Sequence, residues 1–318
     1  LGINPMTMNN TKLQTVLLCL VCTFFWGAGY PVVKLSCAYF GIQPLDVPGK
    51  LLHAGCRFML AGALLLGVSW LRGKRAAFPN RQTLPAVLRL SLCQTVLQYG
   101  LLYVGLANTS GTKGSVLNQI NVFLLVLLTP LFFKKEKLTK QKLLGCVVGF
   151  AGIVVMNLSG LRFSIEWGDL VVVLSSCFAA AGYLLAKAMP SVCDPIVTTG
   201  WQQLLGGGTL LVIGLLCGGR LQEWNALGVA TFLFLVVCAA AAYSLWFYLL
   251  QRNDVSRISV FKFLTPIFGV ALSGLLLGEN IFTLENILAL ALVCAGLMIA
   301  NGAARRHTPA ACTAEGKS

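Results

Sequence analysis

The chain has 318 residues, of which 57% are hydrophobic and 11% are charged, and its formal net charge at pH 7 is +14. A soluble domain of this length is normally about 25% charged, because its surface must be solvated. The composition therefore excludes a soluble globular protein and indicates an all-α integral membrane protein. The basic residues lie mainly in short segments between apolar runs, where they set membrane orientation, so we expect no nucleic-acid partner.

In chain order, ten apolar runs are long enough to cross a bilayer, which takes about 20 residues as a helix. They cover residues 14–36, 51–71, 86–106, 112–133, 141–158, 168–189, 196–217, 226–250, 256–277 and 284–303. No small-residue cleavage pattern follows the first run, so it is interpreted as a retained helix and not as a signal peptide. We expect residues 1–13 to be a disordered leader and residues 304–318 a cytoplasmic tail.

The basic residues between the runs predict the orientation. One set of segments carries seventeen of them: Lys12, Arg72, Lys74, Arg75, Arg81, Arg89, Lys134, Lys135, Lys137, Lys140, Lys142, Lys187, Arg252, Arg257, Arg305, Arg306 and Lys317. The alternate segments carry four: Lys50, Lys113, Arg162 and Arg220. Because cytoplasmic loops are enriched in Lys and Arg, this asymmetry predicts that both termini are cytoplasmic.

The second half of the chain repeats the first at a nearly constant spacing. Adding 144 maps Tyr99 onto Tyr243, Lys113 onto Arg257, Ser115 onto Ser259, Gly152 onto Gly296 and Asn157 onto Asn301, and adding 153 maps Tyr30 onto Tyr183 and Lys34 onto Lys187. Five helices separate the copies, and because five is odd, the copies face opposite ways. The pattern predicts two inverted five-helix repeats, at 14–158 and 168–303, an arrangement typical of carriers that open a central site alternately to each side.

Three short motifs resemble the EamA family of the drug/metabolite transporter superfamily. The stretch 24–34, Phe-Phe-Trp-Gly-Ala-Gly-Tyr-Pro-Val-Val-Lys, is similar to its first-helix signature, and Arg57-Phe58 to its Arg-Phe pair. The stretch 264–268 through Gly278-Glu279 is similar to its ninth helix and following turn. The resemblance covers about residues 12–304. It implies a substrate cavity lined by helices 1–4 and 6–9, peripheral helices 5 and 10, and transport, commonly outward, of amino acids, drugs, sugars or other small metabolites.

One position departs from the symmetry of these motifs. Val122 stands opposite Pro266 in the repeat, so we expect any hinge that depends on this proline to form only in the second copy.

Polar residues within spans are costly and normally point inward, so they are the candidate site residues. Trp26, Tyr30 and Lys34 share one face of the first helix, at intervals of four residues. For Lys34, near the helix end, we expect the side chain to reach the outer surface. Arg57 and Lys262 lie two turns, roughly 10 Å, inside their helices. Each is interpreted as meeting either a substrate carboxylate or phosphate, or backbone carbonyls, water or the membrane surface, and for Arg57 the structural role is favoured.

Amides and aromatic side chains gather in four further helices. The predicted substrate-binding residues are Trp26, Tyr30, Gln98, Asn118, Trp201, Tyr243 and Lys262, with Arg57, Gln94, Asn121, Gln202 and Trp246 as a second set. Hydrogen bonding between helices is the alternative explanation for the amides. The pattern Gly145-x-x-x-Gly149, followed by Gly152, predicts close helix packing, either within the scaffold or in a homodimer contact.

The sequence carries no catalytic or cofactor motif. It has no metal-binding or nucleophile pattern and no phosphate-binding loop, so we expect no enzyme activity and no cofactor. Its ten acidic residues lie in loops, at helix ends or in the tail. A lack of carboxylates deep in the spans favours exchange or facilitated diffusion, and anionic or zwitterionic cargo.

The predicted function is transport of small metabolites, amino acid-like or other organic solutes, across the cytoplasmic membrane by an exporter or exchanger. Its expected partners are the small-molecule substrate and membrane lipids. Three alternatives remain open at this point: a flippase that binds phosphate head groups through Arg57 and Lys262, a non-transporting membrane scaffold, and a membrane-embedded enzyme.

Overall fold

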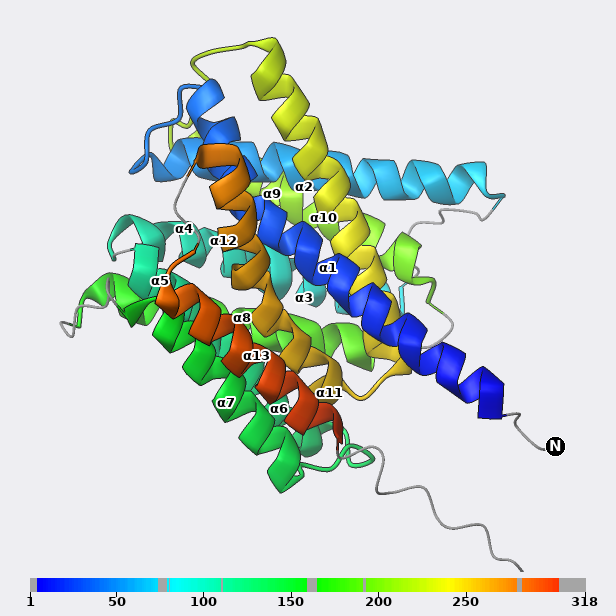
Figure 1. Ribbon diagram of the computed structural model, residues 1–318. Coiled ribbons are helices and arrows are strands. Elements are labelled where there is room, and N and C mark those ends of the chain that lie inside the picture. The colour runs from blue at the N-terminus through cyan, green and yellow to red at the C-terminus, as the bar shows by residue number, and fades with distance from the viewer. Residues whose placement is uncertain are drawn as a thin grey trace, which may run out of the picture.

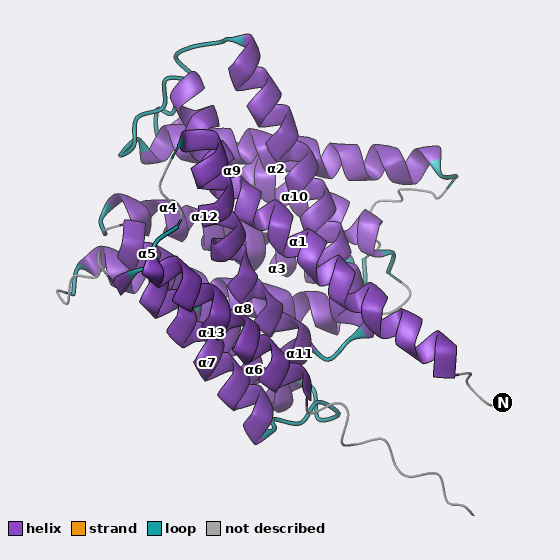
Figure 2. Ribbon diagram, viewed as in Figure 1, coloured by secondary structure: helices purple, strands orange, loops and turns teal. Residues whose placement is uncertain are grey.

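The computed structural model describes residues 5–73, 79, 81–109, 111–158, 165–190, 193–278 and 282–302. All regular structure within these residues is helical (Figure 2). The segments are α1 (Pro5–Tyr39), α2 (Val47–Leu71), α3 (Leu84–Ser91), η1 (Leu92–Leu97), α4 (Gln98–Ala107), α5 (Gly111–Asn118), α6 (Ile120–Phe132), α7 (Lys140–Met156), α8 (Trp167–Ala188), α9 (Pro195–Leu216), α10 (Ala226–Arg252), α11 (Val255–Ser259), η3 (Val260–Phe263), α12 (Leu264–Leu277) and α13 (Leu284–Gly302).

These segments form the ten expected membrane helices. Three of the ten are composite: α3 runs through η1 into α4, α5 continues as α6, and α11 runs through η3 into α12. Seven of the described helices are long and apolar enough, by length and composition, to cross a membrane. We call the side where α1 begins and α13 ends the terminal face, and the other side the opposite face (Figure 1).

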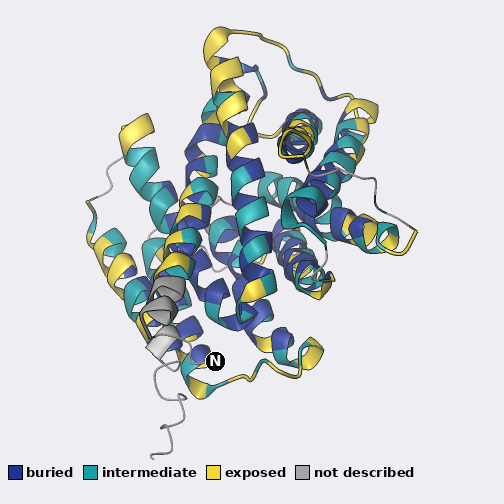
Figure 3. Cartoon of the chain, turned by 90° about the vertical axis from the view of Figure 1, so that its right-hand side faces the viewer, coloured by how far each residue is buried: buried dark blue, intermediate teal, exposed yellow. Residues whose placement is uncertain are grey.

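Large apolar side chains cover the outside of the bundle. Leu144, Val237, Leu275 and Met298 are examples of exposed residues on four different helices. Figure 3 shows buried residues on the inner helix faces and exposed residues on the outer faces and at the loops. Because such a surface is favourable only against hydrocarbon, the fold is that of an integral membrane protein.

Two expectations about helix ends differ from the structure. α1 begins at Pro5, so residues 5–13 are helical and do not form the disordered leader that we expected, while residues 1–4 and 303–318 lie outside the described chain. Proline is well suited to a first helical turn, and no helix breaker separates Pro5 from the apolar run. α2 begins at Val47, four residues early, because the Asp46 side chain accepts the Gly49 amide at 2.8 Å and caps the helix.

The fourth and ninth membrane helices are both broken, and at equivalent positions. α6 begins at Ile120, after a break at Gln119, and α12 begins at Leu264, exactly one repeat spacing later, after the 3₁₀ turn η3. A break is therefore present in both copies, although only the second has the proline. Pro266 lies in the first turn of α12, where its missing N–H costs little, so the break does not depend on the proline.

Contacts between helices repeat across the two halves. α1 packs against α10 and α12, and its counterpart α8 packs against α4, α5 and α6. The remaining helices pair with their own counterparts, α2 with α9 and α7 with α13 (Figure 1). The hydroxyls of Tyr99 and Tyr243, which the repeat makes equivalent, hydrogen-bond at 2.7 Å. Equivalent residues can meet in this way only near the axis that relates the copies, so the fold is a pair of inverted repeats.

Glycines bring the two counterpart pairs into backbone contact. A Cβ on Gly207 of α9 would lie 2.3 Å from the Met59 amide nitrogen of α2, and one on Gly62 would lie 2.4 Å from the Leu204 nitrogen. In the other pair, a Cβ on Gly145 would lie 2.6 Å from the Gly296 carbonyl oxygen. The Gly145-x-x-x-Gly149 motif therefore packs α7 against α13 within one chain.

Ion pairs join the two repeats at both faces. At the opposite face, the Lys113 ammonium lies 3.1 Å from Glu166 and 2.9 Å from Asp169, at the start of α8. At the terminal face, Lys142 pairs with Asp254, and Lys187 lies 3.6 Å from Glu136.

Backbone groups complete the terminal-face network. Lys187 donates to the Asn253 carbonyl at 2.8 Å, and the Val255 amide donates to Glu136 at 2.8 Å. The first repeat, through the loop after α6 and the start of α7, is thereby held against the second repeat at the end of α8 and the start of α11.

The glycine contact between α2 and α9 can be tested with two neighbouring glycines. Gly207→Ala should lower the free energy of unfolding of the detergent-purified protein by about 1–3 kcal/mol, and with it the melting temperature, because the new methyl group meets backbone that cannot move aside. Gly208→Ala is the matched control, since nothing lies within 4 Å of a Cβ there. Equal melting temperatures for the two variants, measured by size-exclusion after heating, would contradict this packing.

The terminal-face network predicts a pH dependence of stability. Burial and the neighbouring Asp254 raise the pKa of Glu136 to about 7, although Lys187 opposes the shift. Burial also acts to raise the pKa of Asp254, but hydrogen bonds from Glu136 and Lys142 lower it overall. When folding raises the pKa of a carboxyl, protonation of that carboxyl stabilises the folded state at low pH. This stabilisation is lost as the pH rises through the folded-state pKa.

We therefore expect the melting temperature to fall by a few degrees as the pH rises from below 6 to above 8. Glu136→Gln should remove most of this change, because the amide stays neutral throughout. A variant that keeps the full pH dependence of the wild type would show that another group is responsible.

Candidate functional site

One large cavity lies between the two repeats. It has a volume of about 700 Å³ and is lined from α1, α2, α4, α8 and α10, from both broken helices, and from the turn at 41–44. This turn belongs to the opposite face, so the cavity extends from the middle of the bundle to that face. Among the described residues, α7, α9 and α13 contribute nothing to its lining.

Lys262 forms the inner end of the cavity. It stands in the short 3₁₀ turn η3 and is 7% exposed. Its ammonium group donates to the Asn121 side-chain oxygen at 2.9 Å and lies 3.8 Å from the centre of the Tyr183 ring and 5.2 Å from that of Trp26. None of the ion pairs within the described chain includes it. One amide and two aromatic faces therefore hold a cation that lacks a counter-ion.

Aromatic rings line the wall beside Lys262. The Trp26 ring lies at the centre of this group, with its centroid 5.7 Å from that of Tyr243, 5.1 Å from Trp246 and 6.4 Å from Tyr183, all in edge-to-face arrangements. Such pairs fix one another's orientation. The wall is therefore a preformed apolar surface that can receive an apolar or aromatic group of a ligand.

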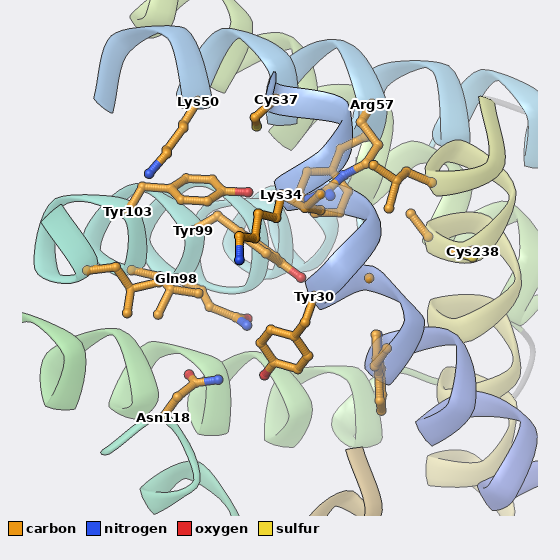
Figure 4. Close-up of a pocket in the computed structure, with 18 of the residues that line it drawn as sticks. Tyr30, Lys34, Cys37, Lys50, Arg57, Gln98, Tyr99, Tyr103, Asn118 and Cys238 are labelled. Carbon is orange, nitrogen blue, oxygen red and sulfur yellow. The ribbon is translucent and has the colours of Figure 1, made fainter. Parts of the chain in front are cut away.

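Arg57 is the second buried cation of the cavity. It is 6% exposed, and its guanidinium carbon lies 4.6 Å from the centre of the Phe58 ring and 6.0 Å from that of Tyr99. The Tyr103 hydroxyl points toward it in Figure 4. The Arg57 Nε has no hydrogen-bond partner within the described chain. A guanidinium with an unused donor is suited to bind a carboxylate.

Two lysines and an accessible tyrosine lie toward the mouth. Lys34 is exposed and lines the cavity, and Lys50 donates to the Pro44 carbonyl at its rim. Tyr30 is 46% exposed, and in Figure 4 its hydroxyl points toward Asn118. Lys34 thus borders the cavity, and its predicted reach to the outer surface stays a prediction.

The lining is strongly biased toward positive charge. Its cationic side chains are Lys34, Lys50, Arg57 and Lys262, and no Asp or Glu is among the described residues that line it. A positive lining with low-dielectric walls concentrates field and attracts anions. The site is therefore matched to a negatively charged group on an apolar body.

The structure brings together eight of the twelve residues predicted from the sequence. The cavity is lined by Trp26, Tyr30, Arg57, Gln98, Asn118, Asn121, Tyr243 and Lys262. Trp201 packs against the core instead. Gln94, Gln202 and Trp246 also lie outside this cavity and surround a smaller pocket, in which Gln202 donates to the Thr95 hydroxyl.

Sequence reasoning missed several lining residues. Tyr183, Tyr99 and Tyr103 all border the cavity, and Tyr183 makes the shortest contact between Lys262 and an aromatic ring. The signal for Tyr183 was present, because the repeat makes it the counterpart of Tyr30. For Tyr103 no such signal exists, since its counterpart is Phe247.

Similar proteins agree with this architecture. The sequence model of the EamA-like transporter family matches residues 13–158 and again residues 166–302. An uncharacterized transporter of Synechocystis is 29% identical, with 87% of this chain and 86% of that protein covered. An S-adenosylmethionine/S-adenosylhomocysteine transporter of Chlamydia muridarum is 23% identical, with 84% and 85% covered. A solved crystal structure, 19% identical, superposes with a TM-score of 0.76 over 92% of this chain and 99% of its own, which shows a shared fold.

Two matches of the family model, one to each half, cover nearly the whole chain, and the named relatives of similar length are transporters. Together with the inverted repeats and the cavity between them, these matches identify a multi-pass membrane transporter. The chain belongs to the EamA-like transporter family.

Proposed function

We propose that the protein carries small organic solutes with a carboxylate or a similar anionic group across the cell membrane by alternating access. The observation that supports this most directly is the cavity, which has four cations, an aromatic wall and no acidic lining residue in the described chain. Its volume of about 700 Å³ suits one metabolite-sized molecule, since ligand sites usually have about 300–1,000 Å³.

The inner end of the cavity supplies the charge recognition. Within the described chain, the Lys262 ammonium donates a hydrogen bond to the Asn121 side chain and forms no ion pair, so a substrate carboxylate would give it a counter-ion. Arg57 lines the same cavity and supplies a second buried cation. The apolar part of the solute would lie against Trp26 and the tyrosines, which are already oriented by their neighbours.

The two faces of the protein differ in a way that fits alternating access. The cavity reaches the opposite face, whereas the terminal face is closed by the network around Glu136 and Asp254. With both termini in the cytoplasm, as the charge asymmetry predicts, this conformation is open to the outside. Because none of the described lining residues is a carboxylate that could carry a coupling proton, we infer an exporter or exchanger that follows the gradients of its solutes.

A ligand panel tests the anionic class. Organic anions and zwitterions with an aromatic or apolar body should raise the melting temperature of the purified protein, whereas matched cations should not. A ligand at 100 times its Kd stabilises the folded state by about 2.7 kcal/mol, a shift of several degrees. Stabilisation by cations alone would contradict the anionic class, and stabilisation by anionic lipid head groups alone would favour a flippase.

A single substitution tests the role of Lys262. In proteoliposomes, Lys262→Met should lower uptake of a stabilising anion by about tenfold or more, because a hydrogen bond to a charged group contributes about 1.5–3 kcal/mol. Replacing a buried cation with an apolar side chain of similar size is often neutral or stabilising, so the fold should be retained.

Lys140→Met is the matched control, since it removes the same charge from an exposed position outside the cavity. Wild-type uptake by Lys262→Met, with normal behaviour of the control, would remove Lys262 from the binding site.

A further inference from the structure

A second, nearly closed pocket lies between the main cavity and the terminal face. It has a volume of about 10 Å³, room for no more than one water molecule. Its lining includes Gln94, Ala186, Gln202, Trp246, Phe247 and Leu250. Three of these, Gln94, Gln202 and Trp246, are site residues predicted from the sequence that do not line the main cavity.

The repeat relates this small pocket to the main cavity. Subtracting 144 takes Tyr243, Trp246, Phe247 and Leu250 to Tyr99, Leu102, Tyr103 and Leu106, and subtracting 153 takes Ala186 to Val33. Adding 144 takes Gln94 to Cys238. All six of these counterparts line the main cavity. Most residues of the small pocket are therefore the repeat equivalents of residues that line the open main cavity.

In a carrier built from inverted repeats, the two halves exchange conformations when the site opens to the other side. The residues of one half that line the open cavity therefore identify their equivalents in the other half. These equivalents should line the cavity after the exchange. We propose that the small pocket around Gln94, Ala186 and Phe247 is the collapsed second half of the substrate path, and that it opens toward the terminal face when Lys187 leaves Glu136. This inference rests on the alternating access proposed above.

The same symmetry explains the position of Lys187. Its counterpart is Lys34, which lines the open mouth at the opposite face. Lys187 occupies the equivalent place on the terminal side, but there it is bound to Glu136 and to the Asn253 carbonyl. Lys142, bound to Asp254, is the second cation of this closure. Breaking the two ion pairs would free Lys187 to line a mouth at the terminal face.

The two halves of the path differ in charge. The matching glycine contacts of α2 and α9 relate these two helices by a spacing of 152. Arg57 therefore corresponds to Thr209 and Lys50 to Gln202, so two cations of the open half have uncharged counterparts. Gln94 and Gln202 supply amides in their place. After the exchange, an anion would be held mainly by Lys262, with fewer positive neighbours. The path therefore binds an anion more weakly when it opens to the terminal face.

Cysteine accessibility tests the proposal without a known substrate. Ala186→Cys changes little in volume and places a thiol in the small pocket. The protein in proteoliposomes is treated with N-ethylmaleimide, which reacts with thiols in contact with water, and each site is read by mass spectrometry. Native Cys37 and Cys238 line the main cavity and report its opening, and Cys177, exposed on the outside of α8, is the lipid-facing control.

Removing either cation of the closure should open the path. In Lys187→Met and in Lys142→Met, labelling of Ala186→Cys should rise about tenfold, labelling of Cys37 and Cys238 should fall, and Cys177 should stay unreacted. Phe247→Cys, at a second position of the pocket, should behave in the same way as Ala186→Cys.

Two results would overturn the proposal. Unchanged labelling at Ala186→Cys and Phe247→Cys in both cation variants would show that this pocket is not the path or that the network does not close it. A rise that includes Cys177 would show general loosening instead of a path.

Anion uptake by the wild-type chain is measured in the same vesicles. Uptake without labelling at position 186 would support the transport function but contradict this path. Labelling without anion uptake would support the path but contradict the anionic cargo.

Discussion

The contact between Tyr99 and Tyr243 marks the constraint on which the rest of this structure depends. Two equivalent hydroxyls that hydrogen-bond at 2.7 Å must lie near the axis relating the inverted copies. Around that axis, α2 packs against α9 and α7 against α13 through glycines that allow backbone contact, and these pairs form the rigid frame. The broken helices and the helices around them are left to surround the cavity. Symmetry in the frame thus leaves space at the centre for a ligand.

The side chains do not follow the symmetry of the backbone, and this difference gives the molecule its chemistry. The broken helices place Asn118 and Lys262 at equivalent positions, but only one of them is charged. Arg57 and Tyr103 likewise have uncharged counterparts, Thr209 and Phe247. One copy of a symmetric fold can therefore hold cations on the substrate path while the other remains mostly uncharged. The backbone provides two similar conformations, and the side chains make them unequal toward an anion.

The ion pairs at the two faces also divide their roles. Lys113 joins the repeats at the opposite face without closing the cavity, whereas the terminal-face network holds its side shut. The relatives share this architecture, and the S-adenosylmethionine/S-adenosylhomocysteine transporter is one whose name states a cargo. Because cargo depends on a few lining side chains, similarity at this level establishes the family and leaves the solute to the residues described here.

Much of the fold was determined by the sequence alone, because lipid imposes simple rules. Apolar runs of sufficient length must be helices, and a residue spacing preserved between two odd-numbered sets of helices implies inversion. The same rule places costly polar residues inward, which found Trp26, Arg57 and Lys262. It could not find which inward faces meet. Trp201 was predicted as a site residue and Tyr183 was not, yet Trp201 packs against the core and Tyr183 borders the cavity, because helix rotation and tilt are set by packing between neighbours. The pairing of Lys187 with Glu136 was equally hidden, since it joins loops and helix ends that only the assembled bundle brings together.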